Sequence, residues 1–331
     1  MTNRERFNNV LRFQPVDRLP VVEWAGWWDK TISRWHGEGL PEELTDAFDI
    51  REYFGLDAHR QEWIAPYGPD PPPTTKTRAE GRVQSEADYY ELRPYLFPPD
   101  PVDHEKIASW AQQQAAGGLV VWLALDGFFW FPRNLLGIQG HLLAFYDRPA
   151  LLREMNQDLL AYNLRVLDQF CAVCPPDFVV FAEDMSYNHG PMISEALFEE
   201  FMAPCYREIT AALHGRGIPP IIDTDGDITA LVPWMQRVGI RGFLPLERMA
   251  GVDVVQLRRD YPDLLMIGAF DKTVMHRGEE QMREEFERLL PVMRSGGFIA
   301  SCDHQTPPGV SLEDYRLYLK LLREYAERAA R

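Results

Sequence analysis

Short apolar runs alternate with amphipathic helical patterns along most of this chain, and this alternation limits the possible folds more than any other feature. Short apolar runs bounded by turn residues are typical of buried strands, and the longer stretches between them have the periodicity of covering helices. We expect helices to fill the gaps, most clearly at residues 149–172, 194–214 and 312–330. The pattern predicts an α/β fold of βα units with a parallel sheet. The expected strands are residues 19–24, 119–125, 178–182, 218–222, 242–246, 264–268 and 297–301.

The length and composition fit one large domain. The chain has 331 residues, 46% of them hydrophobic, which is ordinary for a single barrel-type domain with a sizeable core. The periodic pattern breaks at two proline-rich stretches, residues 69–73 and 97–101, because proline cannot continue a helix or a central strand. We therefore expect one domain over residues 1–331, with an irregular elaboration at about residues 53–101 that contains a β-hairpin at residues 74–90 and covers one barrel end.

The charge and the targeting signals exclude several classes of protein. Thirty-four basic residues against 50 acidic ones give a net charge of -16, which repels nucleic acid and anionic lipid surfaces. The amino terminus has no signal-peptide core, and the apolar run at residues 119–131 is too short to span a membrane and is interrupted by Asp126. We expect a cytoplasmic protein without a nucleic-acid or membrane partner. The chain also lacks G-x-G-x-x-G, Walker A and G-x-S-x-G sequences, which disfavours nucleotide binding and serine hydrolysis.

Acidic residues follow most of the expected strands. In parallel α/β folds the carboxyl ends of the strands meet at one face, where ligands bind. Capping of the next helix explains some of these acids but not all of them. Carboxylates gathered in one pocket hold a cation, share protons or bind a polar ligand, so we expect this face to carry the function. The residues concerned are Asp126, Glu183, Asp184, Asp223, Asp225, Asp227, Glu247, Asp271 and Asp303.

Aromatic residues and histidines form a second group at the strand ends. Trp24 and Trp27 follow the first expected strand, and Trp130 follows Asp126 in an aromatic run. We expect these rings to line the site, where they suit a small apolar, aromatic or methylated substrate. His304 lies in a loop stiffened by two prolines and is expected in the pocket, and the segment 187–189, which contains Tyr187 and His189, is also expected near the mouth.

Several segments, read in order, resemble a known family. They are residues 2–6, 15–20, 183–185, 190–194, 223–226, 245–247 and 303–308. Together they resemble the uroporphyrinogen decarboxylase family and, more closely, its branch related to corrinoid-dependent methyltransferases. The resemblance spans nearly the whole chain. It implies a TIM (β/α)8 barrel with an N-terminal elaboration, a corrinoid carried by a partner protein, and pairing of barrels as a homodimer.

The resemblance also bears on particular residues. Decarboxylases of this family bind the substrate propionates with an early arginine-rich segment, but the matching residues 22–28 contain no arginine, which disfavours a substrate with many carboxylates. The methyltransferase relatives hold zinc with a His-x-Cys pair and a late cysteine. The matching residues here are Asp223, Asp225 and His304, a ligand set that is harder than thiolates and less selective for zinc.

These observations lead to one main hypothesis and two alternatives. We expect a methyltransferase of one-carbon metabolism that acts on a small substrate, with Asp223, Asp225 and His304 binding a metal or orienting the substrate. A metal-free decarboxylase and a non-catalytic ligand-binding barrel remain open. The expected catalytic residues are Glu183, Asp184, Asp225, Glu247 and His304. The expected substrate-binding residues are Trp24, Trp27, Asp126, Trp130, Tyr187, His189 and Asp271.

Overall fold

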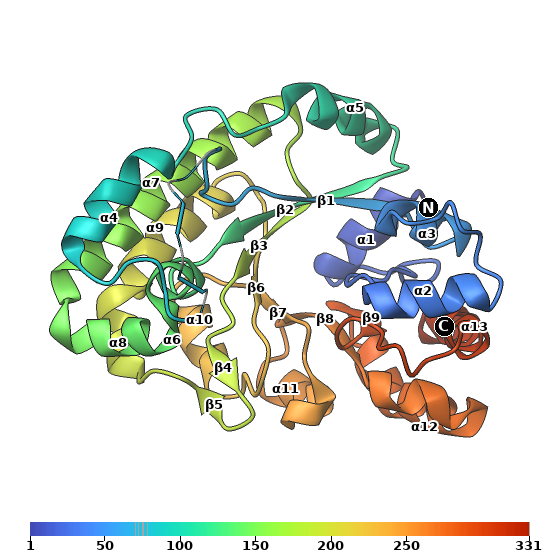
Figure 1. Cartoon of the computed structure of the whole chain (residues 1–331). Helices are drawn as coiled ribbons and strands as arrows, with labels where there is room; N and C mark the ends of the chain where they lie inside the picture. Colours follow the sequence, from blue (N-terminus) through green and yellow to red (C-terminus); the bar gives the residue numbers. More distant parts are fainter. Residues whose placement is uncertain (70, 72, 75, 78, 331) are drawn as a thin grey trace.

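The structure is a computed structural model that describes every residue except 70, 72, 75, 78 and 331. Its centre is a parallel seven-stranded sheet with the order β1-β2-β3-β6-β7-β8-β9. The sheet curls, with helices on its outer side, and confirms the expected α/β TIM-barrel class (Figure 1). The strands are β1 (His59–Trp63), β2 (Val120–Asp126), β3 (Phe178–Ala182), β6 (Pro220–Asp223), β7 (Gly242–Leu244), β8 (Leu265–Phe270) and β9 (Phe298–Cys302).

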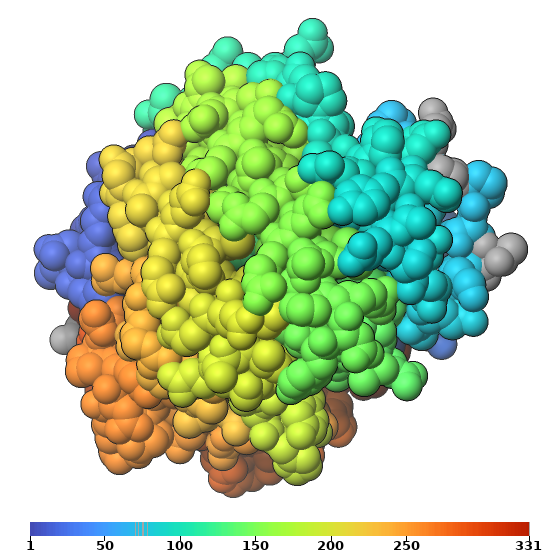
Figure 2. Space-filling view, turned by 90° about the vertical axis from the view of Figure 1, so that its left-hand side faces the viewer, coloured from blue at the N-terminus to red at the C-terminus, as the bar shows by residue number. Residues whose placement is uncertain are grey.

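Helices connect the strands and cover the sheet, and the space-filling view shows part of this closely packed outer layer (Figure 2). In the part of the chain that the structure describes, no helix is long and apolar enough to cross a bilayer. The 3-10 helices among the described residues are η1 (Arg93–Tyr95), η2 (Arg248–Ala250) and η3 (Lys272–Arg277). The α-helices are α1 (Asn3–Leu11), α2 (Asp29–Gly37), α3 (Ala47–Tyr53), α4 (Glu86–Leu92), α5 (His104–Ala115), α6 (Trp130–Asp147), α7 (Pro149–Val173), α8 (Glu195–Phe201), α9 (Ala203–His214), α10 (Leu231–Arg237), α11 (Val254–Asp260), α12 (Glu279–Met293) and α13 (Leu312–Ala329).

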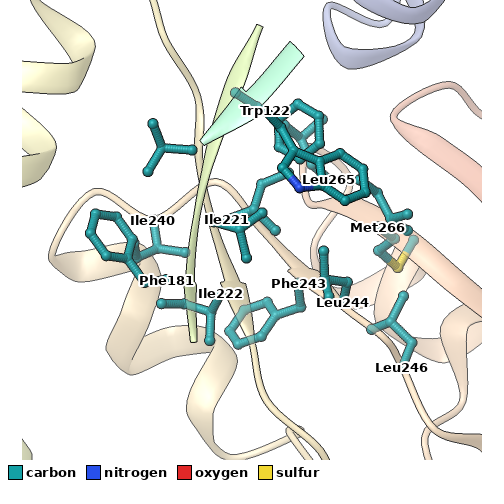
Figure 3. Close-up of a cluster of buried hydrophobic side chains, with 14 of the residues drawn as sticks. Trp122, Phe181, Ile221, Ile222, Ile240, Phe243, Leu244, Leu246, Leu265 and Met266 are labelled. Atoms are coloured by element: carbon teal, nitrogen blue, oxygen red, sulfur yellow. The ribbon is translucent and has the colours of Figure 1, made fainter. Parts of the chain in front are cut away.

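The strands form where the sequence is apolar because both of their faces are buried. Every residue of β2, β3 and β8 is buried, as expected for a parallel sheet enclosed by helices. Side chains from neighbouring strands meet in one core, in which Phe181, Ile222 and Phe243 lie close together (Figure 3). Burial of each such side chain stabilises the fold by about 1.5–3 kcal/mol, so the core fixes the positions of the strand ends.

Capping residues set the starts of two of the expected helices. The Ser194 side chain accepts a hydrogen bond from the Leu197 amide, and Ser311 forms a capping box with Asp314. The single helix expected at residues 194–214 is instead two helices, α8 and α9, which meet at Met202. Pro204, near the start of α9, explains the break, because proline is tolerated in the first turn of a helix but not in its interior.

The strand expected at residues 19–24 is wrong, because this segment is extended but forms no strand. It nevertheless contacts both ends of the sheet. The Val21 carbonyl accepts a hydrogen bond from the Asp57 amide just before β1, and the Trp24 amide donates to Ser301 Oγ in β9 at 3.2 Å. The segment therefore closes the barrel at the seam between β1 and β9.

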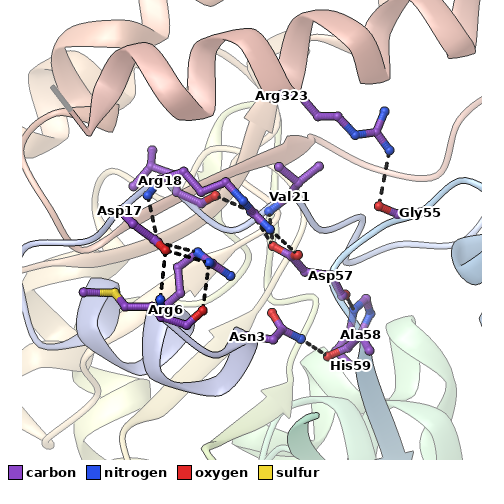
Figure 4. Close-up of polar contacts among 12 residues, drawn as sticks. Asn3, Arg6, Asp17, Arg18, Val21, Gly55, Asp57, Ala58, His59 and Arg323 are labelled. Carbon is purple, nitrogen blue, oxygen red and sulfur yellow. Dashed lines mark hydrogen bonds and ion pairs between the residues drawn. The ribbon is translucent and has the colours of Figure 1, made fainter. Parts of the chain in front are cut away.

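Side chains hold this seam where a strand would use its backbone. The Glu23 carboxylate accepts hydrogen bonds from the Cys302 amide at 2.8 Å and from Ser301 Oγ at 2.5 Å. On the other side, Arg18 binds Asp57 through two hydrogen bonds, and Asp57 also accepts from the Val21 amide at 2.8 Å (Figure 4). The buried carboxylate of Glu23 and the Arg18–Asp57 pair thus replace the missing hydrogen bonds of an eighth strand.

The elaboration at about residues 53–101 differs from the expected hairpin. Its first element is β1, a strand of the seven-stranded sheet that was not expected because most of its residues are polar. The end of the expected hairpin, from residue 86 to residue 90, belongs to α4, because Ser85 and Asp88 make a capping box there. Part of the expected first arm lies outside the described residues. An antiparallel bridge between Tyr67 and Leu96 joins the segments that directly precede the two proline-rich stretches.

Candidate active site

Three predicted site residues meet at the carboxyl ends of the strands. Asp225 follows β6, Glu247 follows β7 and His304 follows β9. One ligand atom from each of these side chains lies within 4.8 Å of the other two. His304 Nε2 is 3.8 Å from Asp225 Oδ2. We call these residues the Asp225–Glu247–His304 cluster.

A glycine turn holds two of these residues together. The Gly226 amide donates a hydrogen bond to Glu247 Oε2 at 3.1 Å, which ties the loop after β6 to the loop after β7. Gly226 has a φ of 85°, and a Cβ there would lie 2.6 Å from the backbone nitrogen of Tyr187. Only glycine fits this turn, so the sequence Asp225-Gly226 is required for the geometry of the cluster.

Burial and like charges shift the pKa values of the neighbouring acids. Burial, with the charges of Asp184, Asp225 and Glu247, raises the pKa of Asp223 well above its ordinary value. Burial followed by the charges of Asp184 and Glu247 raises the pKa of Asp225 to about 7. The pKa of His304 is lowered, first by burial and then by the charge of Lys272. These shifts favour the protonated forms of Asp223 and Asp225 and a neutral His304 imidazole. A cation bound by Asp225 would favour the ionised form of that carboxyl group and would leave the imidazole neutral.

Lys272, which sequence reasoning missed, supplies a positive charge beside the cluster. Its Nζ lies 3.6 Å from Glu247 Oε1 and 3.4 Å from Asp303 Oδ1. Burial alone would lower the pKa of Lys272, but the charges of Asp303 and Glu247 raise it. The ammonium group therefore stays charged. Lys272 comes directly after Asp271 at the end of β8, and this position in the sequence indicates that it lies on the same face as the acids.

Asp303 organises this side of the mouth. It is fully buried and accepts hydrogen bonds from the Lys272 amide at 3.2 Å and the Arg248 amide at 3.1 Å. Burial raises its pKa to about 6 in spite of the Lys272 charge. Its carboxylate thus joins the starts of η2 and η3, next to the cluster.

Glu183, predicted to be catalytic, instead holds the loop after β2. Its buried carboxylate accepts hydrogen bonds from the backbone amides of Phe128, Phe129 and Trp130 at 2.7–3.0 Å, and from the Tyr206 hydroxyl. Burial raises its pKa to about 7, against the effect of these four donors. With both oxygens engaged, this side chain is a structural anchor of the barrel mouth.

Two other predicted substrate-binding residues have structural positions. Asp271 caps η3, because its side chain accepts a hydrogen bond from the Thr273 amide at 2.8 Å. Trp27 is buried in the core, where its ring centroid lies 5.9 Å from that of Trp35 and 5.8 Å from that of Tyr315. Trp27 therefore does not line the mouth, although its sequence neighbour Trp24 is close to it.

The third acid of the 223–227 stretch also has a local role. Asp227 Oδ1 accepts hydrogen bonds from the backbone amide and the hydroxyl of Thr229, at 2.9 and 2.6 Å. The side chain stabilises the turn before α10 and is not part of the cluster. Asp223 is not part of it either, so the expected metal ligands Asp223, Asp225 and His304 are grouped differently, with Glu247 taking the place of Asp223.

Tyr187 and His189 lie on a small exposed hairpin of β4 (Ser186–Tyr187) and β5 (Gly190–Pro191). Their rings are 5.7 Å apart in an edge-to-face contact, and Tyr187 is 49% exposed. The Asp227 amide donates to the Tyr187 carbonyl at 2.9 Å. The hairpin therefore borders the loop that carries Asp225, at the outer rim of the mouth.

The remaining predicted residues lie on two sides of the mouth. Trp24 contacts His304 edge-to-face with ring centroids 6.4 Å apart, and its indole donates to the Cys302 carbonyl at 2.7 Å. Asp126 and Trp130 line a cavity of about 450 Å³ at the carboxyl ends of β1 and β2. Asp184, at the end of β3, has a φ of 42° and accepts a hydrogen bond from Arg133 through its carbonyl.

Comparisons with known proteins agree with this architecture. The structure of a methyltransferase from Methanosarcina mazei is similar, with a TM-score of 0.63 and 14% identity over 98% of each chain. A putative vitamin-B12 independent methionine synthase from Listeria monocytogenes gives a TM-score of 0.46 and 12% identity over 96% of this chain and 97% of its own. At 14% identity the likeness to the methyltransferase concerns the fold alone. A search of curated protein sequences gives no match.

A family model describes more than half of the chain. The model for uroporphyrinogen decarboxylase (URO-D) matches residues 138–325. This range includes β3, β6, β7, β8 and β9, and with them the loops that carry the Asp225–Glu247–His304 cluster. The chain therefore belongs to the uroporphyrinogen decarboxylase family.

Proposed function

We propose that this chain is a methyltransferase that moves a methyl group from a small substrate to an acceptor such as a corrinoid carried by a partner protein. The observation that carries the proposal is the convergence of Asp225, Glu247 and His304 at the barrel mouth. By the resemblance to the family, Asp225 and His304 match positions at which the methyltransferase relatives hold zinc. Similarity in fold to the methanosarcinal methyltransferase supports this choice within the family.

The cluster fits a divalent cation. Two carboxylate oxygens and one imidazole nitrogen are donors that zinc and other divalent first-row metals accept. In a tetrahedral site, ligand atoms about 2.0–2.2 Å from the ion lie about 3.3–3.6 Å apart, so the present spacing of up to 4.8 Å would close by about 1.2–1.5 Å on metal binding. Such an ion would act as a Lewis acid that stabilises negative charge on the acceptor or on the leaving group.

The other side chains of the mouth have separate roles in the proposed reaction. Burial raises the pKa of Asp223 well above its ordinary value, so in this proposal Asp223 is protonated and donates its proton to the departing atom of the methyl donor. Lys272 holds Glu247 and Asp303 in place by its charge. Glu183 fixes the loop that carries Trp130, so it positions the wall of the site and does not take part in proton transfer.

The test compares two aspartates of the same loop. Asp225→Asn removes one ligand of the cluster, whereas Asp227→Asn changes a turn residue outside it. Elemental analysis of the purified proteins measures bound metal, and the absorbance of cob(I)alamin during incubation with simple methyl donors measures transfer. We expect Asp225→Asn to lose metal and activity with its circular dichroism unchanged, while Asp227→Asn keeps both. Turnover at the wild-type rate in Asp225→Asn would refute the assignment.

One observation favours a second candidate, a metal-free carboxy-lyase. A decarboxylase must protonate the carbon that loses carbon dioxide, and Asp223 holds a proton at the mouth. The two candidates differ in their need for a metal and in whether they release carbon dioxide. Protein stripped of metal by a chelator would still release carbon dioxide from an acid substrate if it were a lyase, but it would not transfer methyl groups.

A further inference from the structure

A cavity with aromatic walls lies at the carboxyl ends of β1 and β2. Its volume is about 450 Å³, within the range of about 300–1,000 Å³ that is usual for small-molecule sites. Trp63 comes from the end of β1, Trp130 from the first turn of α6, and Tyr67 and Tyr95 from the elaboration. Leu96 and Leu135 add aliphatic walls. The elaboration and the barrel thus line the cavity together, and it opens to solvent on one side.

Two rings of the cavity, those of Trp63 and Trp130, are held by defined contacts. The Trp63 indole donates a hydrogen bond to Asp126 Oδ1 at 2.8 Å, and its ring centroid is 6.4 Å from that of Trp130. Trp130 is held through its backbone by Glu183 and lies under the guanidinium of Arg133, 5.4 Å from the ring centroid. The bridge between Tyr67 and Leu96 fixes the opposite rim. Preorganised aromatic faces of this kind favour a flat partner that can stack at centroid distances of about 4.5–7 Å.

The register of the sheet places this cavity within reach of the cluster. Asp126 in β2 is paired with Ala182 in β3, and Ala182 is paired with Asp223 in β6. Neighbouring strands are about 4.8 Å apart, so Asp126 and Asp223 are separated by about 10 Å. A one-ring ligand in the cavity can therefore extend a substituent toward Asp223 and the cluster.

We propose that this cavity binds compounds with a single planar aromatic ring. In the proposed reaction such a compound is the methyl donor, so its role as donor rests on the proposed function, whereas its binding does not. The aromatic walls select the ring, and the polar lining residues Asp126, Arg82 and Asn134 contact its substituents.

The binding test uses three aromatic probes and their saturated counterparts. Phenol, benzoate and benzylamine differ in charge, and each is compared with cyclohexanol, cyclohexanecarboxylate or cyclohexylmethylamine by isothermal titration and ligand-observed NMR. We expect at least one aromatic probe to bind at least about threefold more tightly than its saturated counterpart, because stacking favours the planar ring. The absence of binding by all three aromatic probes, or equal affinity for ring and saturated counterpart, would overturn the proposal.

Matched variants place the binding in the cavity. Trp130→Leu and Tyr95→Ala remove two of its rings, whereas Trp28→Leu and Tyr146→Ala remove exposed rings that do not line it. The first two are expected to weaken the best probe at least about threefold each, and the last two to leave it unchanged. Tyr95 is 41% exposed, so its variant should fold and decides the matter if Trp130→Leu does not. Equal losses in cavity and control variants would contradict the proposal.

The same measurements separate this inference from the proposed function. Aromatic binding without methyl transfer to cob(I)alamin would leave the cavity assignment intact and remove its role in the proposed reaction. Methyl transfer from small non-aromatic donors, without binding of aromatic compounds, would support the proposed function and refute the cavity assignment.

Discussion

The loop that follows β2 depends on one buried carboxylate, and Glu183→Gln tests that dependence. Glu183 accepts four hydrogen bonds, from three backbone amides and from the Tyr206 hydroxyl. At pH 5.5 the Glu183 carboxyl group is largely protonated, but both of its oxygens still have lone pairs that can accept hydrogen bonds. A glutamine side chain has only one acceptor oxygen, and its NH₂ group, which cannot accept, would face two of these donors. Each buried donor left without an acceptor costs about 1–3 kcal/mol, so we expect a loss of about 2–6 kcal/mol in the free energy of unfolding.

The assay is urea denaturation at pH 5.5, followed by circular dichroism and tryptophan fluorescence. Glu200→Gln is the matched control, because Glu200 is an exposed residue whose partner is Arg153 on the surface. We expect that control to lose less than about 1 kcal/mol. If Glu183→Gln were as stable as Glu200→Gln, the four hydrogen bonds would not anchor the loop and the reasoning would be wrong.

The pKa of Glu183 makes this effect depend on pH. Burial raises the pKa to about 7, above the value near 4.5 expected in the unfolded chain. Between these values the folded protein binds more protons than the unfolded chain, so the contribution of Glu183 is full below pH 4.5 and falls by about 3 kcal/mol as the pH rises through 7. The stability advantage of the wild type over Glu183→Gln should therefore shrink from pH 5.5 to pH 8. An advantage that grows with pH would contradict the shift.

Two further predictions concern the same barrel mouth. Lys272→Met removes an ammonium group that lies 3.4–3.6 Å from Asp303 and Glu247 and whose positive charge repels a metal ion. We expect titration calorimetry to show roughly tenfold tighter Mn²⁺ binding by this variant. Weaker Mn²⁺ binding would show that the lysine supports the metal site. Gly127→Ala places a Cβ only 2.3 Å from Cδ of Glu183, and we expect a lower melting temperature and weaker binding of aromatic probes. An unchanged melting temperature would show that the loop can accommodate the extra methyl group.

The fold could be predicted where burial dictates the sequence. Six of the seven expected strands are present because both faces of each are buried, which requires continuous apolar runs. The run at residues 19–24 is buried too, yet it forms no strand because side chains such as Glu23 satisfy the neighbouring strand. The strand β1 was missed because its sequence, His59–Trp63, is mostly polar and only partly buried.

The site could be predicted as a region but not residue by residue. Parallel topology brings all strand ends to one face, so the acids were expected together, and Asp225, Glu247 and His304 do meet. What the sequence does not reveal is which backbone amides each carboxylate will find. Glu183 and Asp271 are engaged by amides of neighbouring loops, and this depends on the tertiary arrangement of those loops.

The seam at residues 19–24 gives the barrel a preferred line of local opening. Elsewhere each strand is joined to its neighbours by backbone hydrogen bonds, but here closure depends largely on the side chains of Glu23, Arg18 and Asp57. Amide hydrogens along β9 should therefore exchange with solvent through a partial opening that leaves the other strands protected. His304 lies just after β9, so local opening of the seam would transiently widen the mouth of the barrel. The rate of this opening would then limit how fast bulky ligands enter and leave.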